Sequence, residues 1–390
     1  MTTTRPRRLR AAALLAALTV SAVPAWAAVA AADSGGGTSG AAGRGALKTT
    51  LDRIVKEGAV GAQAEVRDER GRWTGRSGTA RLGTGRPMPA DGRFRIGSTT
   101  KAFTATVVLQ LVGEKKVSLD DTVEHWLPGL VTDGSRITVR HLLNHTSGLF
   151  DYLRTKGMPK DGDDIRRDGR RTYTPEELVR LAVKNPPFFP PGTSWMYSNT
   201  NYILAGMIIE RAAGNTFHEE VPRRIIEPLG LRDTFLPGTS VKIPGVHARG
   251  YFPRTIEPVG ALVDVTEFNP SFAGAAGEMI STTADVSRFF TALLSGKLLA
   301  PEQLKEMTTI VDISQQTGVP GLGYGLGLES VRLSCGARSW GHGGSTPGYA
   351  TYVGFTRDAR RQAVLYATGL TSEKSDAAAK EMVDRALCGD

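Results

Sequence analysis

The 390-residue sequence contains only two cysteines, Cys335 and Cys388, and two cysteines so far apart do not form a zinc-binding motif. After the amino-terminal region, no apolar run reaches the roughly 18 residues that a transmembrane helix needs. The formal net charge is +9, but the basic residues are spread along the chain rather than gathered into one patch. We therefore expect neither a transmembrane segment nor a nucleic-acid partner.

Two common hydrolase signatures are also missing. No Gly-x-Ser-x-Gly motif occurs, which disfavours an α/β-hydrolase. His141 and His145 have the spacing of a zinc-protease helix, but Leu142 stands where the glutamate that activates water would be. We interpret both histidines as structural and expect no metal and no other cofactor.

The first 45 residues have the composition of an export segment. Met1 to Arg10 carry four arginines and no acid, and the apolar stretch Ala11 to Val23 and a group of small residues follow. This order is typical of a secretory signal peptide, which we place at residues 1–32, followed by a flexible leader at 33–45. We therefore expect a secreted, extracellular protein, in which the two cysteines pair as a disulfide.

Residues 46–390 predict one domain with two lobes. Apolar spacing predicts helices at 47–57, 138–144, 175–183, 199–213, 216–226 and 375–387. Alternation and turn residues predict strands at 62–67, 72–80, 325–333, 338–342, 350–355 and 361–368. The charged stretch 153–172 is expected to be a surface loop. The predicted fold class is α/β plus an all-α lobe: an antiparallel sheet (46–117 and 270–390) flanked by terminal helices, with a helical lobe (118–269) inserted.

The most informative motif is Ser98-Thr99-Thr100-Lys101, the only Ser-x-x-Lys in the chain. Residues three apart lie on one face of a helix, so the lysine amine can take the serine proton. A surface helix with a capping serine and a solvated lysine would look the same. However, apolar residues follow Lys101, and a lysine that enters a buried helix needs a reason.

Two further motifs are weak individually. Tyr197-Ser198-Asn199 precedes a predicted helix, where Asn199 or Ser198 could simply be the helix cap. Alternatively, the tyrosine could relay protons and the asparagine could bind a substrate amide. His342-Gly343-Gly344-Ser345 ends a predicted strand with glycines that allow close approach of a ligand backbone, although it could be an ordinary strand histidine beside a turn.

In the order Ser-x-x-Lys, Tyr-x-Asn and His-x-Gly, the three motifs resemble those of the penicillin-recognising serine hydrolases, which include DD-peptidases and class C β-lactamases. The resemblance runs from about Leu51 to Cys388 and is closest to the exported D-alanyl-D-alanine carboxypeptidases of actinomycetes. Supporting stretches lie at 93–98, 142–149, 197–202 and 323–328. The implied fold is that of the β-lactamase/DD-peptidase group.

The resemblance implies that Ser98 is the acylated nucleophile and that Lys101 and Tyr197 handle the protons. It implies substrate binding by Asn199, His342, Gly344 and Ser345, with an oxyanion hole formed by the backbone N–H groups of Ser98 and Ser345. The implied partners are a peptidoglycan stem peptide, or a small ester or amide, and β-lactam inhibitors. We expect a monomer. Which of Lys101 and Tyr197 is the base stays open at this point.

Two positions depart from the family pattern. Glu329 stands where the DD-peptidases have a basic residue that helps to bind the terminal carboxylate of the substrate, and Gly343 replaces a frequent threonine. Arg332, three residues further along a strand, would face the other way. A D-alanyl-D-alanine carboxypeptidase is the first expectation. An esterase, a D-amino-acid amidase, a β-lactamase or a non-catalytic wall-binding relative are the alternatives.

Overall fold

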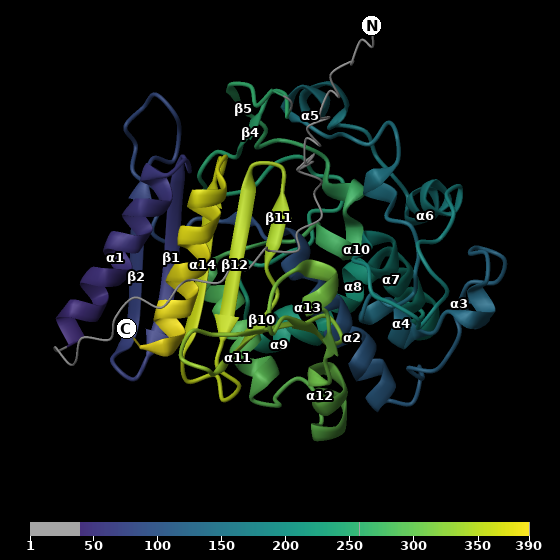
Figure 1. The fold of residues 1–390 in the computed structure, drawn as a ribbon. Helices are drawn as coiled ribbons and strands as arrows, with labels where there is room; N and C mark the ends of the chain where they lie inside the picture. Colours follow the sequence, from purple (N-terminus) through teal and green to yellow (C-terminus); the bar gives the residue numbers. More distant parts are fainter. Residues whose placement is uncertain (1–39, 257, 390) are drawn as a thin grey trace, which may run out of the picture.

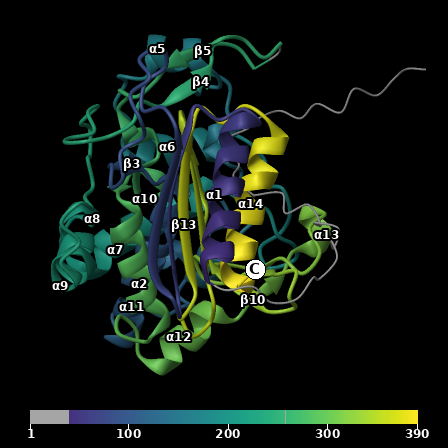
Figure 2. The same ribbon diagram turned by 90° about the vertical axis from the view of Figure 1, so that its left-hand side faces the viewer.

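The computed structural model describes residues 40–256 and 258–389 (Figure 1). The predicted signal peptide and residues 33–39 of the predicted leader lie outside the described residues. The described chain forms a sheet covered by helices on both faces, with a mostly helical region beside it (Figures 1 and 2). No helix in the described part is long and apolar enough to cross a membrane.

The main sheet is antiparallel, with the strand order β2-β1-β13-β12-β10-β9-β8-β7 and with β11 paired to β12. Its strands are β1 (Gly61–Asp68), β2 (Gly71–Gly78), β7 (Val311–Asp312), β8 (Gly323–Tyr324), β9 (Glu329–Arg332), β10 (Arg338–Gly341), β11 (Gly344–Thr346), β12 (Tyr349–Phe355) and β13 (Gln362–Thr368). Because β1 pairs with β13, the two ends of the domain meet within the sheet, near its β2 edge. This arrangement confirms the predicted fold class.

Helices α1 (Gly40–Lys56) and α14 (Glu373–Cys388) pack together over one face of the sheet (Figure 2). Their apolar sides meet the alternate small residues Ala62, Ala64 and Val66 of β1, all of which are buried. Small side chains on the strand let two helices approach the sheet closely. The helix α1 starts inside the segment that we expected to be a flexible leader. Arg44 explains the difference, since its guanidinium donates to the Asp68 carboxylate at 2.8 Å.

The other helices are α2 (Thr100–Gly113), α3 (Val123–Trp126), α4 (Val139–Leu143), α5 (Gly162–Asp168), α6 (Pro175–Val183), α7 (Asn199–Ala213), α8 (Phe217–Val221), α9 (Glu227–Leu229), α10 (Gly274–Gly277), α11 (Thr283–Leu294), α12 (Pro301–Thr308) and α13 (Ser314–Thr317). Short turns of helix lie at η1 (Gly97–Thr99), η2 (Gly134–Arg136), η3 (Tyr152–Arg154), η4 (Pro222–Ile226) and η5 (Pro270–Phe272), and two small sheets pair β3 (Phe94–Arg95) with β6 (Ile280–Ser281) and β4 (Tyr251–Pro253) with β5 (Leu262–Asp264).

The expectation that 153–172 is a plain loop was wrong, because η3 ends and α5 lies within it. Asp161 caps α5 by accepting from the Asp164 backbone N–H at 2.9 Å, and Ile165 is buried. A cap and one buried apolar side chain are enough for this short helix, although its many charges hide the pattern in the sequence.

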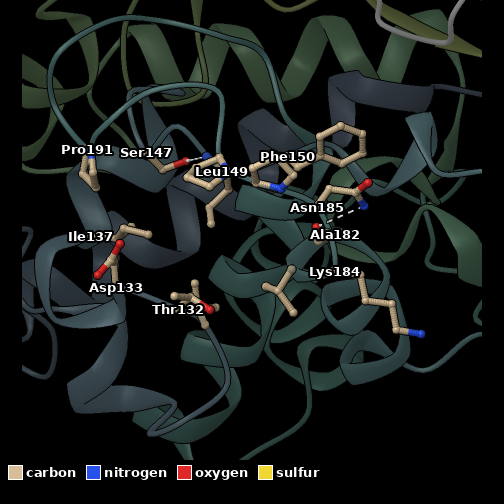
Figure 3. A pocket seen from close by; sticks show the side chains of 14 residues that line it. Thr132, Asp133, Ile137, Ser147, Leu149, Phe150, Ala182, Lys184, Asn185 and Pro191 are labelled. Atoms are coloured by element: carbon tan, nitrogen blue, oxygen red, sulfur yellow. Dashed lines mark hydrogen bonds between the residues drawn. The ribbon is translucent and has the colours of Figure 1, made fainter.

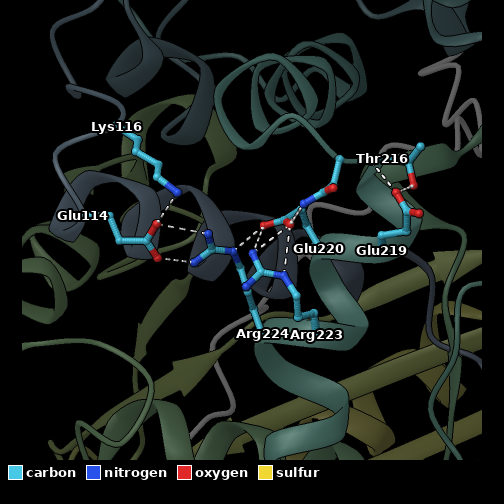
Figure 4. Close-up of polar contacts among 8 residues, drawn as sticks. Glu114, Lys116, Thr216, Glu219, Glu220, Arg223 and Arg224 are labelled. Carbon is cyan, nitrogen blue, oxygen red and sulfur yellow. Dashed lines mark hydrogen bonds and ion pairs between the residues drawn. The ribbon is translucent and has the colours of Figure 1, made fainter.

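An ion-pair network joins α2 to the segment α8–η4 (Figure 4). Glu220 is fully buried and is paired with Arg223 and Arg224, and Arg224 continues to Glu114 just after α2. The Arg224 guanidinium holds the pKa of Glu114 at about 2. A buried carboxylate needs such partners, because isolated burial of a charge is costly. The network therefore fixes the carboxyl end of the central helix α2 against the helical region.

Cys335 and Cys388 form a disulfide in the structure, with their Cα atoms 5.8 Å apart. The bond joins the turn between β9 and β10 to the last residue of α14. Cys388 packs against the cluster that α1 and α14 form with the sheet, whereas Ser98 lies in η1 at the start of α2.

We expect the double variant Cys335→Ser/Cys388→Ser to unfold at a lower temperature than the wild type. The closed loop spans 53 residues, and the chain-entropy model gives about 4 kcal/mol for a loop of this length. Thermal unfolding followed by circular dichroism measures the change, and the rate of Ser98 acylation should stay the same. An unchanged melting temperature would contradict the prediction.

Candidate active site

Ser98 and Lys101 lie at the start of the central helix. Ser98 is in the single turn η1, and Lys101 is in the first turn of α2. The Lys101 side chain is fully buried, and its Nζ is 3.1 Å from Ser98 Oγ, 2.8 Å from Asn199 Oδ1 and 2.7 Å from the Ala276 carbonyl oxygen. The sequence spacing predicted the contact with Ser98. The other two contacts come from α7 and α10, which the motif alone does not reveal.

These three contacts suit either protonation state of the lysine. A charged ammonium has three N–H groups and can donate one to each oxygen. A neutral amine can donate to Asn199 and Ala276 and accept the Ser98 proton on its lone pair. Burial lowers the pKa of Lys101 to about 7, while the charges of Asp151 and Glu329 oppose this shift. Much of the protein therefore carries a neutral amine beside the serine near neutral pH.

Tyr197 lies on the other side of the same lysine. Its ring is buried, Lys101 Nζ is 4.8 Å from the ring centroid, and its hydroxyl has no hydrogen-bond partner among the described residues. Burial raises the pKa of Tyr197 well above 10, against a smaller lowering by Ser98. The tyrosine is therefore a neutral O–H group near neutral pH, and its free hydroxyl can donate to a bound molecule.

Asn199, the first residue of α7, connects Lys101 to a carboxylate that the sequence analysis missed. Its Oδ1 accepts from Lys101, and its Nδ2 donates to Asp151 Oδ2 at 3.0 Å. Asp151 is fully buried just before η3, and burial raises its pKa. Both ends of the Asn199 amide thus orient the lysine. Its predicted role in substrate binding stays a prediction, with one remaining N–H available for it.

Two glycines bring the strand β11 against the turn that holds Ser98. Gly97 has φ of +52°, and a Cβ there would stand 2.7 Å from the Ser345 carbonyl oxygen and 2.9 Å from the Ser345 nitrogen. A Cβ on Gly344 would stand 1.9 Å from the Ile96 carbonyl oxygen. Only glycine permits this approach. The backbones of Ser98 and Ser345 are therefore neighbours, as an oxyanion hole between them requires.

His342, at the end of β10, is buried with both ring nitrogens engaged inside the protein. Its Nε2 is 2.8 Å from the Tyr324 hydroxyl, and its Nδ1 is 2.6 Å from the Gly343 carbonyl oxygen. Burial lowers its pKa to about 3, so the ring is neutral. A direct hydrogen bond from this ring to a substrate, as predicted, would require the ring to give up one of these two partners.

Glu329, the first residue of β9, lies beside the same turn. Its Oε2 accepts from the Gly343 backbone N–H at 3.4 Å. Burial raises the pKa of Glu329 to about 7, opposed by the Gly343 N–H and by Lys101. Arg332, at the other end of the strand, is exposed. The site thus has a carboxyl group near Lys101 and Tyr197 at the position where the family resemblance places a cation.

A pocket of about 250 Å³ lies beside the segment that leads to Asp151 (Figure 3). Its wall includes Leu149, Phe150 and Ile137, and Lys184 and Asp133 also line it. Ser98, Lys101 and Tyr197 are not among its lining residues, so this pocket is distinct from the candidate catalytic group.

A buried lysine beside a serine, a neutral tyrosine hydroxyl and two backbone N–H groups define the class of serine hydrolases that use lysine rather than a histidine–aspartate pair. The chain belongs to the beta-lactamase family, whose model matches residues 47–387.

Solved structures and curated proteins agree with this assignment. A D-stereospecific amidohydrolase from Streptomyces sp. is 41% identical, with a TM-score of 0.82 over 89% of this chain and 99% of that chain. A D-amino acid amidase from Ochrobactrum anthropi SV3 is 31% identical, with a TM-score of 0.76 over 88% of this chain and 98% of that chain. Penicillin-binding protein 4* of Bacillus subtilis (strain 168) is 27% identical over 71% of this chain, and the match spans 60% of that protein.

Proposed function

We propose that this protein hydrolyses amides or esters of D-configured acyl groups through an acyl-Ser98 intermediate, and that it prefers substrates without a free carboxylate next to the scissile bond. The site supports acyl transfer, and two relatives of the same length as the domain are a D-stereospecific amidohydrolase and a D-amino acid amidase. The particular observation that carries the preference is the carboxyl group of Glu329 beside Lys101.

In the acylation step, neutral Lys101 takes the Ser98 hydroxyl proton as Ser98 Oγ attacks the substrate carbonyl carbon. The carbonyl π electrons move to the oxygen, and the backbone N–H groups of Ser98 and Ser345 stabilise the resulting oxyanion. The C–N or C–O bond then breaks, and the leaving group receives a proton through the Tyr197 hydroxyl, which Lys101 resupplies. In the second half of the cycle, water attacks the acyl carbonyl carbon and gives a proton to Lys101. The bond between that carbon and Ser98 Oγ then breaks, the acid is released, and Lys101 returns the proton to Ser98 Oγ.

Lys101 is the base in this proposal for an electrostatic reason. Its pKa of about 7 makes the neutral form available at physiological pH. Tyr197 would have to lose a proton at a pKa well above 10, and its negative charge would be buried near Glu329 and Asp151. The tyrosine therefore acts as a relay rather than as the primary acceptor.

The charge of Glu329 separates an amidase or esterase from a D-alanyl-D-alanine carboxypeptidase. A carboxypeptidase substrate carries a free carboxylate one residue beyond the scissile bond, and a carboxylate at Glu329 repels it. Because Glu329 ionises around pH 7, the repulsion should grow as the pH rises through that value. The buried hydrogen bond between Lys101 and Ser98, with the Tyr197 ring beside the lysine, supports catalysis rather than wall binding alone.

We expect the wild type to hydrolyse a D-amino acid amide with a higher kcat/KM than the matched D-Ala-D-Ala peptide with a free carboxylate, by about 10- to 100-fold. A hydrogen bond to a charged group is typically worth about 1.5–3 kcal/mol, and each 1.4 kcal/mol is a factor of ten. Glu329→Arg should narrow the gap, and Glu329→Gln should reduce its dependence on pH. Both substrates are measured on all three proteins between pH 6 and 9.

Glu302→Gln, on the exposed first turn of α12, serves as the control for removal of a carboxylate far from the site. It should behave as the wild type does. A wild-type preference for the charged peptide would show that a carboxypeptidase is the better description and that another group supplies the cation.

Because the chain begins with a predicted signal peptide, we also propose that the protein acts outside the cell on wall peptides or small amides.

A further inference from the structure

A buried chain of three side chains, His145–Tyr324–His342, runs beneath the catalytic group. His145 Nε2 is 3.2 Å from the Tyr324 hydroxyl, and the same hydroxyl is 2.8 Å from His342 Nε2. Both histidines are fully buried, and Tyr324 is 1% exposed. The three residues come from the turn after α4, from β8 and from the end of β10, so only the fold brings them together.

The partners at the first end fix the proton on His145. Its Nδ1 faces two donors, the Ser198 backbone N–H at 3.2 Å and the Asn201 amide nitrogen at 3.0 Å. The Asn201 oxygen is already in use, because it accepts from the Ser147 hydroxyl at 2.6 Å, so its NH₂ group must face the ring. Nδ1 of His145 is therefore an acceptor, and the proton of the neutral ring lies on Nε2.

The partners at the second end fix His342 independently. Its Nδ1 is 2.6 Å from the Gly343 carbonyl oxygen, which can only accept, so Nδ1 carries the proton. Its Nε2 must then accept from Tyr324. One direction satisfies the whole chain: His145 Nε2–H donates to the tyrosine oxygen, and the tyrosine O–H donates to His342 Nε2.

Each end of the chain holds a different part of the active site. The His145 ring lies 4.2 Å from the Tyr197 ring, centroid to centroid, and its Nδ1 holds the backbone of the next residue, Ser198. The His342 backbone carbonyl accepts from the Thr99 hydroxyl at 3.0 Å, next to Ser98, and its ring holds the turn that leads to Ser345. The chain thus spans from the proton relay to the oxyanion hole.

We propose that Tyr324 is a positioning residue that fixes the Tyr197 hydroxyl relative to the Ser345 backbone N–H, by holding His145 and His342 at a set separation in defined tautomers. This inference rests on the acyl-Ser98 chemistry proposed above and does not depend on the identity of the substrate. Its physical basis is that a buried polar group without a partner is costly, so each ring has one orientation that satisfies the network. Misplacement of a reacting group by about 1 Å can cost about 100-fold in rate.

The tautomers can be observed directly in the wild-type protein. The sequence has six histidines, so long-range ¹H–¹⁵N NMR of the imidazole rings gives few signals, which His145→Gln and His342→Gln variants assign. We expect a neutral Nε2–H ring for His145 and a neutral Nδ1–H ring for His342 at pH 7. The reverse tautomer of either ring, or a charged ring, would contradict the proposed hydrogen-bond chain from His145 through Tyr324 to His342.

Kinetics of Tyr324→Phe test the positioning role. The variant keeps the ring and removes only the hydroxyl, so we expect kcat for a p-nitrophenyl ester to fall about 10- to 100-fold while KM changes less than about threefold. Tyr352→Phe is the matched control, because Tyr352 is also a buried tyrosine whose hydroxyl donates, at 2.7 Å, to Asp376 on the other side of the sheet. It should leave kcat within about twofold of the wild type.

A kcat of Tyr324→Phe equal to that of the control would refute the positioning role even if both variants lose similar stability. Failure of the proposed function looks different. In that case the wild type itself forms no Ser98 adduct with the ester. The NMR measurement of the two tautomers does not depend on Ser98 acylation and tests the hydrogen-bond chain separately.

Discussion

Ser98→Ala is expected to abolish the covalent adduct that an activated ester or a penicillin forms with this protein, and to lower turnover by at least about 10⁴-fold. Ser98 Oγ is the atom that bonds to the acyl group in the proposed reaction. Removal of the nucleophile from a comparable serine hydrolase lowers kcat by about 10⁶-fold. Intact-protein mass spectrometry after mixing should show one added acyl group on the wild type and none on the variant.

Ser287→Ala is a suitable control for this experiment. Ser287 is also buried, but it lies on α11 and its hydroxyl donates to Gln362 at 2.6 Å, away from Lys101. The control should be acylated as fast as the wild type. Equal labelling of wild type and Ser98→Ala would mean that another residue is the nucleophile and that the assignment of Ser98 is wrong.

Lys101→Met should slow Ser98 acylation by about 10²- to 10⁴-fold, since it keeps an unbranched apolar side chain, one atom shorter, and removes the base. Lys101→Arg should be equally slow, because a guanidinium stays protonated in a protein. For the wild type, log kcat/KM should rise with pH up to about 7 and then level off. The sign follows from the neutral amine being the active form, whose fraction grows as the pH rises through the pKa of Lys101.

Glu329 gives this pH profile an internal check. Its negative charge raises the pKa of Lys101, so Glu329→Gln should move the rising limb to lower pH. The two groups interact, and the midpoint belongs to the pair rather than to one residue. A limb that stays in place, or a rate that falls as the pH rises through 7, would contradict Lys101 as the base. Circular dichroism spectra of the Lys101 variants serve to check that they are folded.

The site also shows why local motifs were informative only in part. The spacing of Ser98 and Lys101 set their contact, because a helical turn places residues three apart on one face. His145 was interpreted as structural, and the structure adds that its ring supports Tyr197. Tyr324 lay within a stretch that supported the family resemblance, yet its bridging position depends on strands that are adjacent only in the sheet. Asp151 gave no signal in the sequence, because a single aspartate before a short turn is common.

The sequence analysis did not predict the helix α11 (Thr283–Leu294), but it did predict the terminal helices, the strands at both ends of the domain, the family resemblance and the pairing of hydroxyl and amine at Ser98 and Lys101. These are properties of local periodicity and of residues close together in the chain. The tertiary structure decided the properties that depend on burial and on distant partners: the lowered pKa of Lys101, the neutral state of Tyr197 and the carboxyl group of Glu329 beside them. The physical reason is that desolvation and electrostatic interaction depend on what surrounds a group in space, which the neighbouring residues in the chain do not specify.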